Sequence, residues 1–300
     1  MLIPKNLKIG DTIGILSTAR KFTTEQLTFC TQVLNSWGFN VVIGSSIDAE
    51  EHQFAGSDQI RAKNLQDFID DPTIDAILCA RGGYGTMRII DQIDFSRFKE
   101  NPKWICGFSD VTVLHQHLQN MGIASIHSSM PSLFPTNLDH TTLKSLENAL
   151  KGEELNYHVK INAENLRMQN VEAEIVGGNL SLVYALQGSA SDINTEGKIL
   201  FLEDLDEYYY HIDRMMCSLD RSGKLKNLSA LLIGGMTDMK DNSIPFGMNV
   251  PEIFKYYTEK YNYPVFFDFP SGHQENNYAI RLGAKTKINI IENEYIFTQQ

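Results

Sequence analysis

Short apolar runs alternate with amphipathic stretches along the first half of the chain. The apolar runs predict strands over residues 12–16, 39–43, 74–80 and 104–108. Between them, spacings near 3.6 residues predict helices over 23–37, 57–69 and 110–121. The run at 74–80 is apolar without alternation, which is typical of a strand buried on both faces. Strands that alternate with helices in this way predict βαβ units and a parallel sheet.

The second half of the chain has a different pattern. A polar, charge-rich stretch covers 137–169 and contains one expected helix over 141–150. Beyond it we expect strands over 199–202, 228–233 and 265–269, helices over 179–186, 212–219 and 250–261, and a hairpin over 286–297. The chain therefore predicts an α/β fold. An N-terminal domain with a doubly wound, mostly parallel sheet covers 1–136, a linker region 137–170, and a smaller β-rich α/β C-terminal domain 171–300.

Composition is that of a globular protein. The chain has 300 residues, of which 42% are hydrophobic and 21% are charged, so a packed core needs no disulfide or metal. Twenty-six basic and 37 acidic residues give a net charge of −11, which disfavours a protein that binds nucleic-acid backbones.

The cysteines and the apolar runs bear on location. Cys30, Cys79, Cys106 and Cys217 show no CxxC spacing, so we expect free thiols in a reducing compartment. No apolar run approaches the ~18 residues of a membrane span, and the N-terminus lacks the pattern of a signal peptide. We therefore expect a cytoplasmic protein that does not bind a membrane.

One hydroxyl lies where an expected buried strand gives way to a helix. Ser109 follows the strand at 104–108 and Asp110 opens the helix, at the sheet edge where open α/β folds bind ligands. The helix N-terminus offers N–H groups that stabilise an oxyanion. The pattern resembles a nucleophile elbow, with Val111 in place of the last glycine of G-x-S-x-G. The alternative is that Ser109 only caps the helix.

A glycine-rich segment, Ala-Arg-Gly-Gly-Tyr-Gly-Thr at 80–86, follows the preceding expected strand. Glycines let the backbone approach a ligand and turn N–H groups toward it. The segment matches neither the dinucleotide fingerprint nor the phosphate loop, so it gives little support for a nucleotide site. One of its N–H groups is a candidate for an oxyanion hole, and a tight strand-to-helix turn is the alternative.

Four carboxylates follow the apolar run at 199–202. They are Glu203, Asp204, Asp206 and Glu207. Such a cluster suits Mg²⁺ or Ca²⁺, yet it has no EF-hand spacing and no paired histidine, and a solvated loop is equally consistent. Glu203 is the last strand residue, so a buried carboxylate there would orient a catalytic histidine.

One histidine, His273, lies in a loop shaped by proline and glycine after an expected strand. A surface histidine without function is the alternative. No HExxH segment or Cys/His cluster is present, which disfavours a zinc hydrolase. Together, Ser109, Glu203 and His273 form a chemically complete set: the imidazole accepts the serine proton, and the carboxylate fixes its tautomer. This requires the two domains to face each other.

These segments resemble the serine-type LD-carboxypeptidases, also called muramoyltetrapeptide carboxypeptidases. The matching segments occur in the family's order from end to end: Arg-Gly-Gly-Tyr-Gly at 81–85, Gly-Phe-Ser-Asp at 107–110, Gly-Gly-Asn-Leu at 177–180, Phe-Leu-Glu-Asp at 201–204 followed by Glu207, Ile-Asp-Arg at 212–214, and Ser-Gly-His at 271–273.

The resemblance implies Ser109 as nucleophile, Glu203 as orienting acid and His273 as general base. It also implies an oxyanion hole made by the N–H of Asp110 and the N–H of a loop glycine, for which we choose Gly83.

The implied substrate is a cytoplasmic muropeptide tetrapeptide, cleaved between the L-centre of its diamino acid and the terminal D-Ala during peptidoglycan recycling. Arg81 is our candidate for binding the free carboxylate that an exopeptidase recognises. The resemblance further implies a homodimer and no metal or cofactor.

Other functions stay open. Within the same family, immunity peptidases hydrolyse microcin-C-like aminoacyl-nucleotides and need an aromatic residue to stack on adenine. Trp37 and Trp104 lie inside expected regular elements, which favours the carboxypeptidase, although a tyrosine in 208–210 is a possible stacking residue. A non-catalytic muropeptide-binding module and a divalent-metal hydrolase built on the four carboxylates are the hypotheses from other classes.

Overall fold

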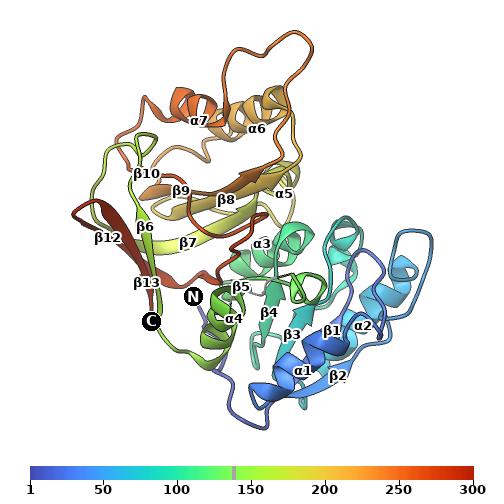
Figure 1. Ribbon diagram of the computed structural model, residues 1–300. Helices are drawn as coiled ribbons and strands as arrows, with labels where there is room; N and C mark the ends of the chain where they lie inside the picture. The colour runs from blue at the N-terminus through green and yellow to red at the C-terminus, as the bar shows by residue number, and fades with distance from the viewer. Residues whose placement is uncertain (137–139) are drawn as a thin grey trace.

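The protein is built around two β-sheets that lie side by side (Figure 1). The computed structural model describes residues 1–136 and 140–300. The first three residues of the predicted linker, 137–139, are outside the described residues. The predicted α/β fold class is confirmed.

The first sheet has six strands in the order β11-β5-β4-β3-β1-β2. Its strands are β1 Thr12–Leu16, β2 Asn40–Ile43, β3 Ala76–Cys79, β4 Trp104–Gly107, β5 Ser125–His127 and β11 Ile280–Leu282. The pairs among β1 to β5 are all parallel, and their order is that of a doubly wound fold whose ligand site lies beyond the carboxyl ends of β1 and β3. β3 and β4 are buried throughout, as their continuous apolar runs predict.

The helices of this half are α1 Thr28–Ser36, α2 Asp58–Asp70 and α3 Thr112–Asn120, with short 3₁₀ turns at η1 Thr86–Arg88, η2 Ile90–Gln92, η3 Ser109–Val111 and η4 Pro131–Leu133. α1 begins five residues later than its Thr23 capping signal predicts. Gln26 accepts a hydrogen bond from the N–H of Thr23 and closes a separate turn before the helix. α2 begins as predicted, with the Ser57 hydroxyl accepting from the N–H of Ile60.

The second sheet has seven strands in the order β10-β9-β8-β7-β12-β13-β6. Its strands are β6 Leu155–Lys160, β7 Val171–Asn179, β8 Ile199–Leu205, β9 Ala230–Thr237, β10 Val265–Phe266, β12 Lys285–Ile291 and β13 Glu294–Gln299. Pairs among β7 to β10 are parallel, and the other pairs are antiparallel. The helices are α4 His140–Lys151, α5 Leu180–Ala185, α6 Tyr209–Arg221 and α7 Val250–Thr258.

Two strands link parts of the chain that the sequence analysis separates. β6 lies within the predicted linker and forms an edge of the second sheet, with alternating buried and exposed residues. β11 comes from the predicted C-terminal domain but joins the first sheet, where Ile280 pairs with His127. The chain therefore crosses between the sheets near its C-terminus.

One hydrophobic core is continuous between the sheets. It includes Trp104 and Ile126 from the first sheet together with Phe201 and Phe266 from the second, all buried. Truncating a phenylalanine such as Phe201 to alanine in a core of this kind costs about 3–5 kcal/mol. This shared packing fixes the ends of β4 and β8 relative to each other. No helix in the described ranges is long and apolar enough to span a bilayer.

Candidate active site

Ser109 lies at the turn that joins β4 to η3 and α3, in a left-handed backbone conformation with φ of +60°. A residue other than glycine in this region costs roughly 1–3 kcal/mol, and such strain is concentrated at functional sites. A sharp strand-to-helix turn of this kind holds a serine hydroxyl above the sheet edge. The backbone around Ser109 thus has the form of a nucleophile elbow.

The glycine-rich loop lies directly against this serine. A Cβ atom placed on Gly82 would be 3.2 Å from Cβ and 3.3 Å from Oγ of Ser109, so glycine permits the close approach. Asp110 joins the two segments: its Oδ2 accepts a hydrogen bond of 2.9 Å from the N–H of Thr86, and the N–H of Gly85 also interacts with its carboxylate. Asp110 is buried, and this burial raises its pKa.

Arg61 supports the same loop from α2, a role that the sequence analysis missed. The side chain is fully buried, and Nη1 donates to the carbonyl oxygens of Thr18 at 2.6 Å and Gly85 at 3.0 Å. A signal was present, because Arg61 lies four residues before Leu65 on the buried face of α2. A charged residue on such a stripe requires buried partners.

Glu203 and His273 meet at the carboxyl end of β8. Oε2 of Glu203 lies 2.7 Å from Nδ1 of His273 and also accepts a hydrogen bond of 3.0 Å from its backbone N–H. Glu203 is fully buried, and the His273 side chain is 18% exposed. With a proton on Nδ1, Nε2 of His273 is free to accept another.

The loop that carries His273 is held on both sides. Oδ1 of Asn277 accepts a hydrogen bond of 2.8 Å from the N–H of Gly272, and the Thr237 hydroxyl donates to the carbonyl of His273. Gly272 has a φ of +104°, and a Cβ atom there would lie 2.7 Å from Oε2 of Glu203. Only glycine lets the backbone pass so close to the carboxylate.

Glu203 and His273 each shift the pKa of the other so that the charged form is favoured, as the partners of an ion pair do. Burial alone would raise the pKa of Glu203, but the charge and hydrogen bonds of His273 lower it. Burial alone would lower the pKa of His273, but the charge and hydrogen bond of Glu203, and the charge of Asp204, raise it. The imidazole is therefore a stronger base than an ordinary histidine.

Phe108 brings the serine turn and the histidine together. Its ring packs against the imidazole of His273 with centroids 4.7 Å apart, and Ser109 is the next residue. In the described part of the chain, Ser109 Oγ makes no hydrogen bond with His273. Catalytic hydrogen bonds are often long in unliganded enzymes and tighten only in the substrate complex.

The other three carboxylates of the acidic cluster have different partners. Asp204 accepts hydrogen bonds from Asn179, Ser181 and Leu205, Glu207 lies 2.6 Å from Nδ1 of His211, and Asp206 pairs with Lys240. Burial raises the pKa of Asp204 to about 6. Within residues 1–136 and 140–300, no three or more His, Cys, Asp or Glu side chains are placed to hold a metal ion.

Two arginines flank the glycine-rich loop. Arg81, the predicted carboxylate ligand, is half-buried. Arg20, which the sequence analysis did not consider, lies over Gly83: a Cβ there would be 2.6 Å from its Cδ and Nε atoms. Arg20 follows β1, at the edge where a doubly wound sheet binds ligands. This position in the sequence could have identified it as a candidate binding residue.

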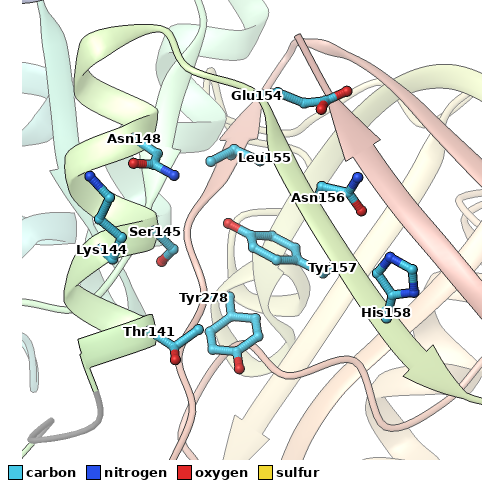
Figure 2. Close-up of a pocket in the computed structure, with 10 residues that line it drawn as sticks. All are labelled: Thr141, Lys144, Ser145, Asn148, Glu154, Leu155, Asn156, Tyr157, His158 and Tyr278. Atoms are coloured by element: carbon cyan, nitrogen blue, oxygen red, sulfur yellow. The ribbon is translucent and has the colours of Figure 1, made fainter.

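A separate pocket of about 550 Å³ lies between α4 and β6 (Figure 2). Lys144, Tyr157 and Tyr278 are among the residues around it. None of the predicted site residues lines this pocket. The chemistry predicted from the sequence therefore belongs to the strand ends described above.

Comparisons with known proteins give one consistent result. The chain matches the LD-carboxypeptidase N-terminal domain over residues 13–128 and the LD-carboxypeptidase C-terminal domain over 172–288. It is 32% identical over 294 residues to the probable murein peptide carboxypeptidase of Bacillus subtilis, covering 96% of this chain and 92% of the relative. It is 27% identical over 282 residues to the murein tetrapeptide carboxypeptidase of Pseudomonas aeruginosa, covering 90% and 91%.

Solved structures share the same architecture. The muramoyltetrapeptide carboxypeptidase of Oxalobacter formigenes superposes with a TM-score of 0.87 at 25% identity over 96% of this chain and 98% of its own. The microcin C7 self-immunity protein MccF in complex with aspartyl sulfamoyl adenosine has a TM-score of 0.87 at 21% identity, covering 100% and 99%. The second likeness shows the fold alone.

The two-sheet fold is that of the serine-type LD-carboxypeptidases. The chain belongs to the LD-carboxypeptidase family, as the sequence resemblance implies. It is therefore a serine-type carboxypeptidase.

Proposed function

We propose that this enzyme hydrolyses the L,D-peptide bond that holds the terminal D-Ala of a muropeptide tetrapeptide. The observation that carries this proposal is the 2.7 Å contact between Glu203 and His273 beside the strained turn at Ser109. The names of the relatives from Pseudomonas aeruginosa and Oxalobacter formigenes support the class of substrate.

In the proposed mechanism, Nε2 of His273 takes the hydroxyl proton of Ser109 as Oγ attacks the carbonyl carbon. Glu203 stabilises the imidazolium that forms. The tetrahedral intermediate collapses as His273 gives this proton to the leaving amine of D-Ala, which leaves an acyl-enzyme. A water molecule, deprotonated by the same histidine, then hydrolyses the ester and restores Ser109.

We assign the oxyanion hole to the backbone N–H groups of Asp110 and Gly83. Both belong to segments that the Asp110–Thr86 hydrogen bond locks together, so the donors are preorganised before substrate binds. The N–H of Asp110 is also at the start of the η3–α3 helical segment, where the backbone partial charge favours an anion. Arg81, with Arg20 beside it, is the proposed ligand of the substrate carboxylate.

We also propose a cytoplasmic homodimer that acts in peptidoglycan recycling. The cysteines are free, and Cys30, Cys79 and Cys106 are buried, which suits a reducing compartment. Light scattering of the purified protein measures the oligomeric state. A monomer at micromolar concentration would contradict the dimer.

A second substrate class has its own observation. Tyr208 and Tyr210 follow β8, each is 37% exposed, and their ring centroids are 5.7 Å apart. Aromatic faces of this kind stack on a nucleobase. They support an immunity-type peptidase that cleaves aminoacyl-nucleotides, the class of compound bound by the MccF structure.

The experiment is mass spectrometry of the protein after incubation with a muropeptide tetrapeptide or with an aminoacyl sulfamoyl adenosine, beside Ser109→Ala. Loss of D-Ala by wild type only supports the proposal. Cleavage of the aminoacyl sulfamoyl adenosine alone would support the second substrate class, with the same three residues as its catalytic groups. A Ser109→Ala variant that keeps its rate would refute the mechanism for both.

A further inference from the structure

A second histidine lies buried behind the Glu203–His273 pair. His127 ends β5, with Gly107 of β4 on one side and Ile280 of β11 on the other. Its imidazole is fully buried, 5.0 Å from the Phe201 ring and 5.7 Å from the Phe108 ring between centroids. The mechanism described above does not use this histidine.

Several buried polar atoms around His127 lack hydrogen bonds. Within the described residues, Nδ1 and Nε2 of His127, Oε1 of Glu203 and Nδ2 of Asn277 have no hydrogen-bond partner of good geometry. Each such atom costs about 1–3 kcal/mol of stability. His115 provides a contrast: it is equally buried, but Nδ1 lies 2.8 Å from the Ser125 hydroxyl and Nε2 lies 2.9 Å from the carbonyl of Gly107.

The unpaired atoms belong to one neighbourhood. Phe201 and Glu203 are two residues apart on β8, so their side chains share a face of the sheet, and the His127 ring packs on Phe201. His127 interacts electrostatically with Glu203 and, more weakly, through hydrogen bonding with the side chain of Asn277, whose Oδ1 holds Gly272 beside the same carboxylate. The unpaired oxygen of Glu203 and the unpaired ring nitrogens of His127 therefore lie in the same buried neighbourhood, where their side chains interact electrostatically.

The charge state of His127 makes it a donor with a single N–H group. Burial lowers its pKa to about 3, so the ring is neutral at physiological pH. A neutral imidazole carries one N–H donor and one acceptor nitrogen. The charged groups that act on it are the carboxylate of Glu203 and the imidazoles of His115 and His273.

We propose that His127 is a positioning residue that donates an N–H hydrogen bond to Oε1 of Glu203. This inference rests on the proposed roles of Ser109, Glu203 and His273. With His127 on Oε1 and His273 on Oε2, both carboxylate oxygens have donors and the side chain has one orientation. The bond also withdraws negative charge from Oε2 and so tunes the basicity of His273.

The proposed hydrogen bond to Oε1 of Glu203 fixes the direction in which the pKa of His273 changes when His127 is replaced. Without a donor on Oε1, the carboxylate attracts the imidazolium of His273 more strongly. The acidic limb of the pH profile of kcat/KM then moves to higher pH, by about 0.5 pH unit for one ordinary hydrogen bond. Asp204, which also acts on His273, is unchanged in this comparison.

The test compares three substitutions. His127→Phe removes the donor but keeps the ring, whereas His127→Gln and His127→Asn each restore an N–H donor at a different reach. The matched control is His115→Phe, which breaks two existing hydrogen bonds of a neighbouring buried histidine. For each variant, the melting temperature and the pH profile of kcat/KM are measured with the muropeptide tetrapeptide.

We expect the melting temperature of His127→Phe to fall less than that of His115→Phe, because His127 loses one proposed hydrogen bond whereas His115 loses two. We expect the kcat/KM of His127→Phe at pH 7 to fall about tenfold and its acidic limb to move upward, and one amide variant to restore the limb. His115→Phe should melt lower without moving the limb. An unmoved limb in His127→Phe, or an equal movement in His115→Phe, overturns the proposal.

Two further readouts keep this inference separate from the proposed function. If Ser109→Ala stays active, the proposed mechanism is wrong. If Ser109→Ala is inactive but the acidic limb of kcat/KM does not move in His127→Phe, only the role of His127 is contradicted. If His127→Phe does not fold, ¹⁵N NMR of histidine-labelled wild-type protein and Glu203→Gln decides. A ¹⁵N shift of His127 that differs between them supports the bond, and identical shifts overturn it.

Discussion

Oδ2 of Asp110 accepts a 2.9 Å hydrogen bond from the backbone N–H of Thr86, which joins the turn after β4 to the loop after β3. The residue that follows the proposed nucleophile thus has two functions. Its N–H is a proposed oxyanion donor, and its buried side chain fixes the loop that carries the other donor.

Removing this carboxylate should therefore impair turnover more than binding. We expect Asp110→Ala to lower kcat by about 10²–10³, the loss typical of one oxyanion-hole donor, with a much smaller change in KM. Asp110→Asn is the matched control, because its amide oxygen can still accept from Thr86. Steady-state kinetics of the two variants check this, and equal losses in both would contradict it.

Glu203→Gln should lower kcat by about 10⁴, as the loss of the orienting carboxylate does in serine hydrolases. A Glu–His pair on the surface serves as control: Oε2 of Glu294 lies 3.0 Å from Nδ1 of the exposed His158. Glu294→Gln should leave kcat unchanged. A rate loss in Glu203→Gln of less than tenfold would refute its role.

The activity should fall on acidification at a pH above the ordinary histidine value of 6.5. Protonated His273 cannot accept the serine proton, and Glu203 and Asp204 raise its pKa above that value despite its burial. The acidic limb of kcat/KM against pH gives this pKa. Asp204→Asn should move the limb downward, because one of the raising charges is lost, and a wild-type limb below 6.5 would contradict the assignment.

Acid should also destabilise the fold before most carboxylates titrate. Burial lowers the pKa of His115 to about 4 and that of His127 to about 3, so below about pH 6.5 the unfolded chain binds protons that the folded chain does not. Each histidine then lowers the free energy of unfolding by up to about 1.4 kcal/mol per pH unit. Urea unfolding between pH 6.5 and 5 measures the slope.

His127→Phe should reduce this slope by about one histidine's share. His273 does not mask the effect. Because its pKa is raised in the folded protein, its contribution to the free energy of unfolding increases as pH falls, but only above pH 6.5, outside the measured range of pH 6.5 to 5. The same slope in variant and wild type would show that His127 is not neutral in the folded protein.

Arg81→Ala and Arg20→Ala should each raise KM about 10- to 100-fold for substrates with a free C-terminal carboxylate, because a charge-assisted contact is lost. Arg88→Ala is the control, as its guanidinium is held by Asp58 near the same loop. Kinetics with a C-terminally amidated substrate complete the test. The variant without effect on KM identifies the arginine that does not bind the carboxylate.

The strands and helices that the sequence predicts are those with a strong local signal. β3 and β4 stand out because a strand buried on both faces is apolar at every position. β7 was not predicted, since Glu172 and Glu174 interrupt its apolar residues and bind lysines at the sheet surface. β11 has only three residues, and its place beside β5 depends on contacts far away in sequence.

For the candidate site, local motifs indicated which residues to consider but not what surrounds them. The sequence analysis placed Glu203 at the end of its strand, but β8 continues to Leu205, and His273 lies in the loop after β10 rather than at a strand end. Because β8 and β10 are parallel strands of the same sheet, the meeting of Glu203 and His273 could still be inferred from topology. The support of the loop by Arg61 and the unpaired state of His127 could not, because both depend on which backbone carbonyls and rings are folded around them. The roles of Gly83 and Arg81 stay predictions.

The segment that carries His273 runs from β10 in one sheet to β11 in the other. Its two ends are thus anchored in different halves of the molecule, while Glu203 belongs to one half and Ser109 to the other. A rotation of one sheet against the other would pull the imidazole away from at least one of its neighbours. If His273 is the base, as proposed, proton transfer from Ser109 requires both halves to stay docked in the arrangement that the shared core holds.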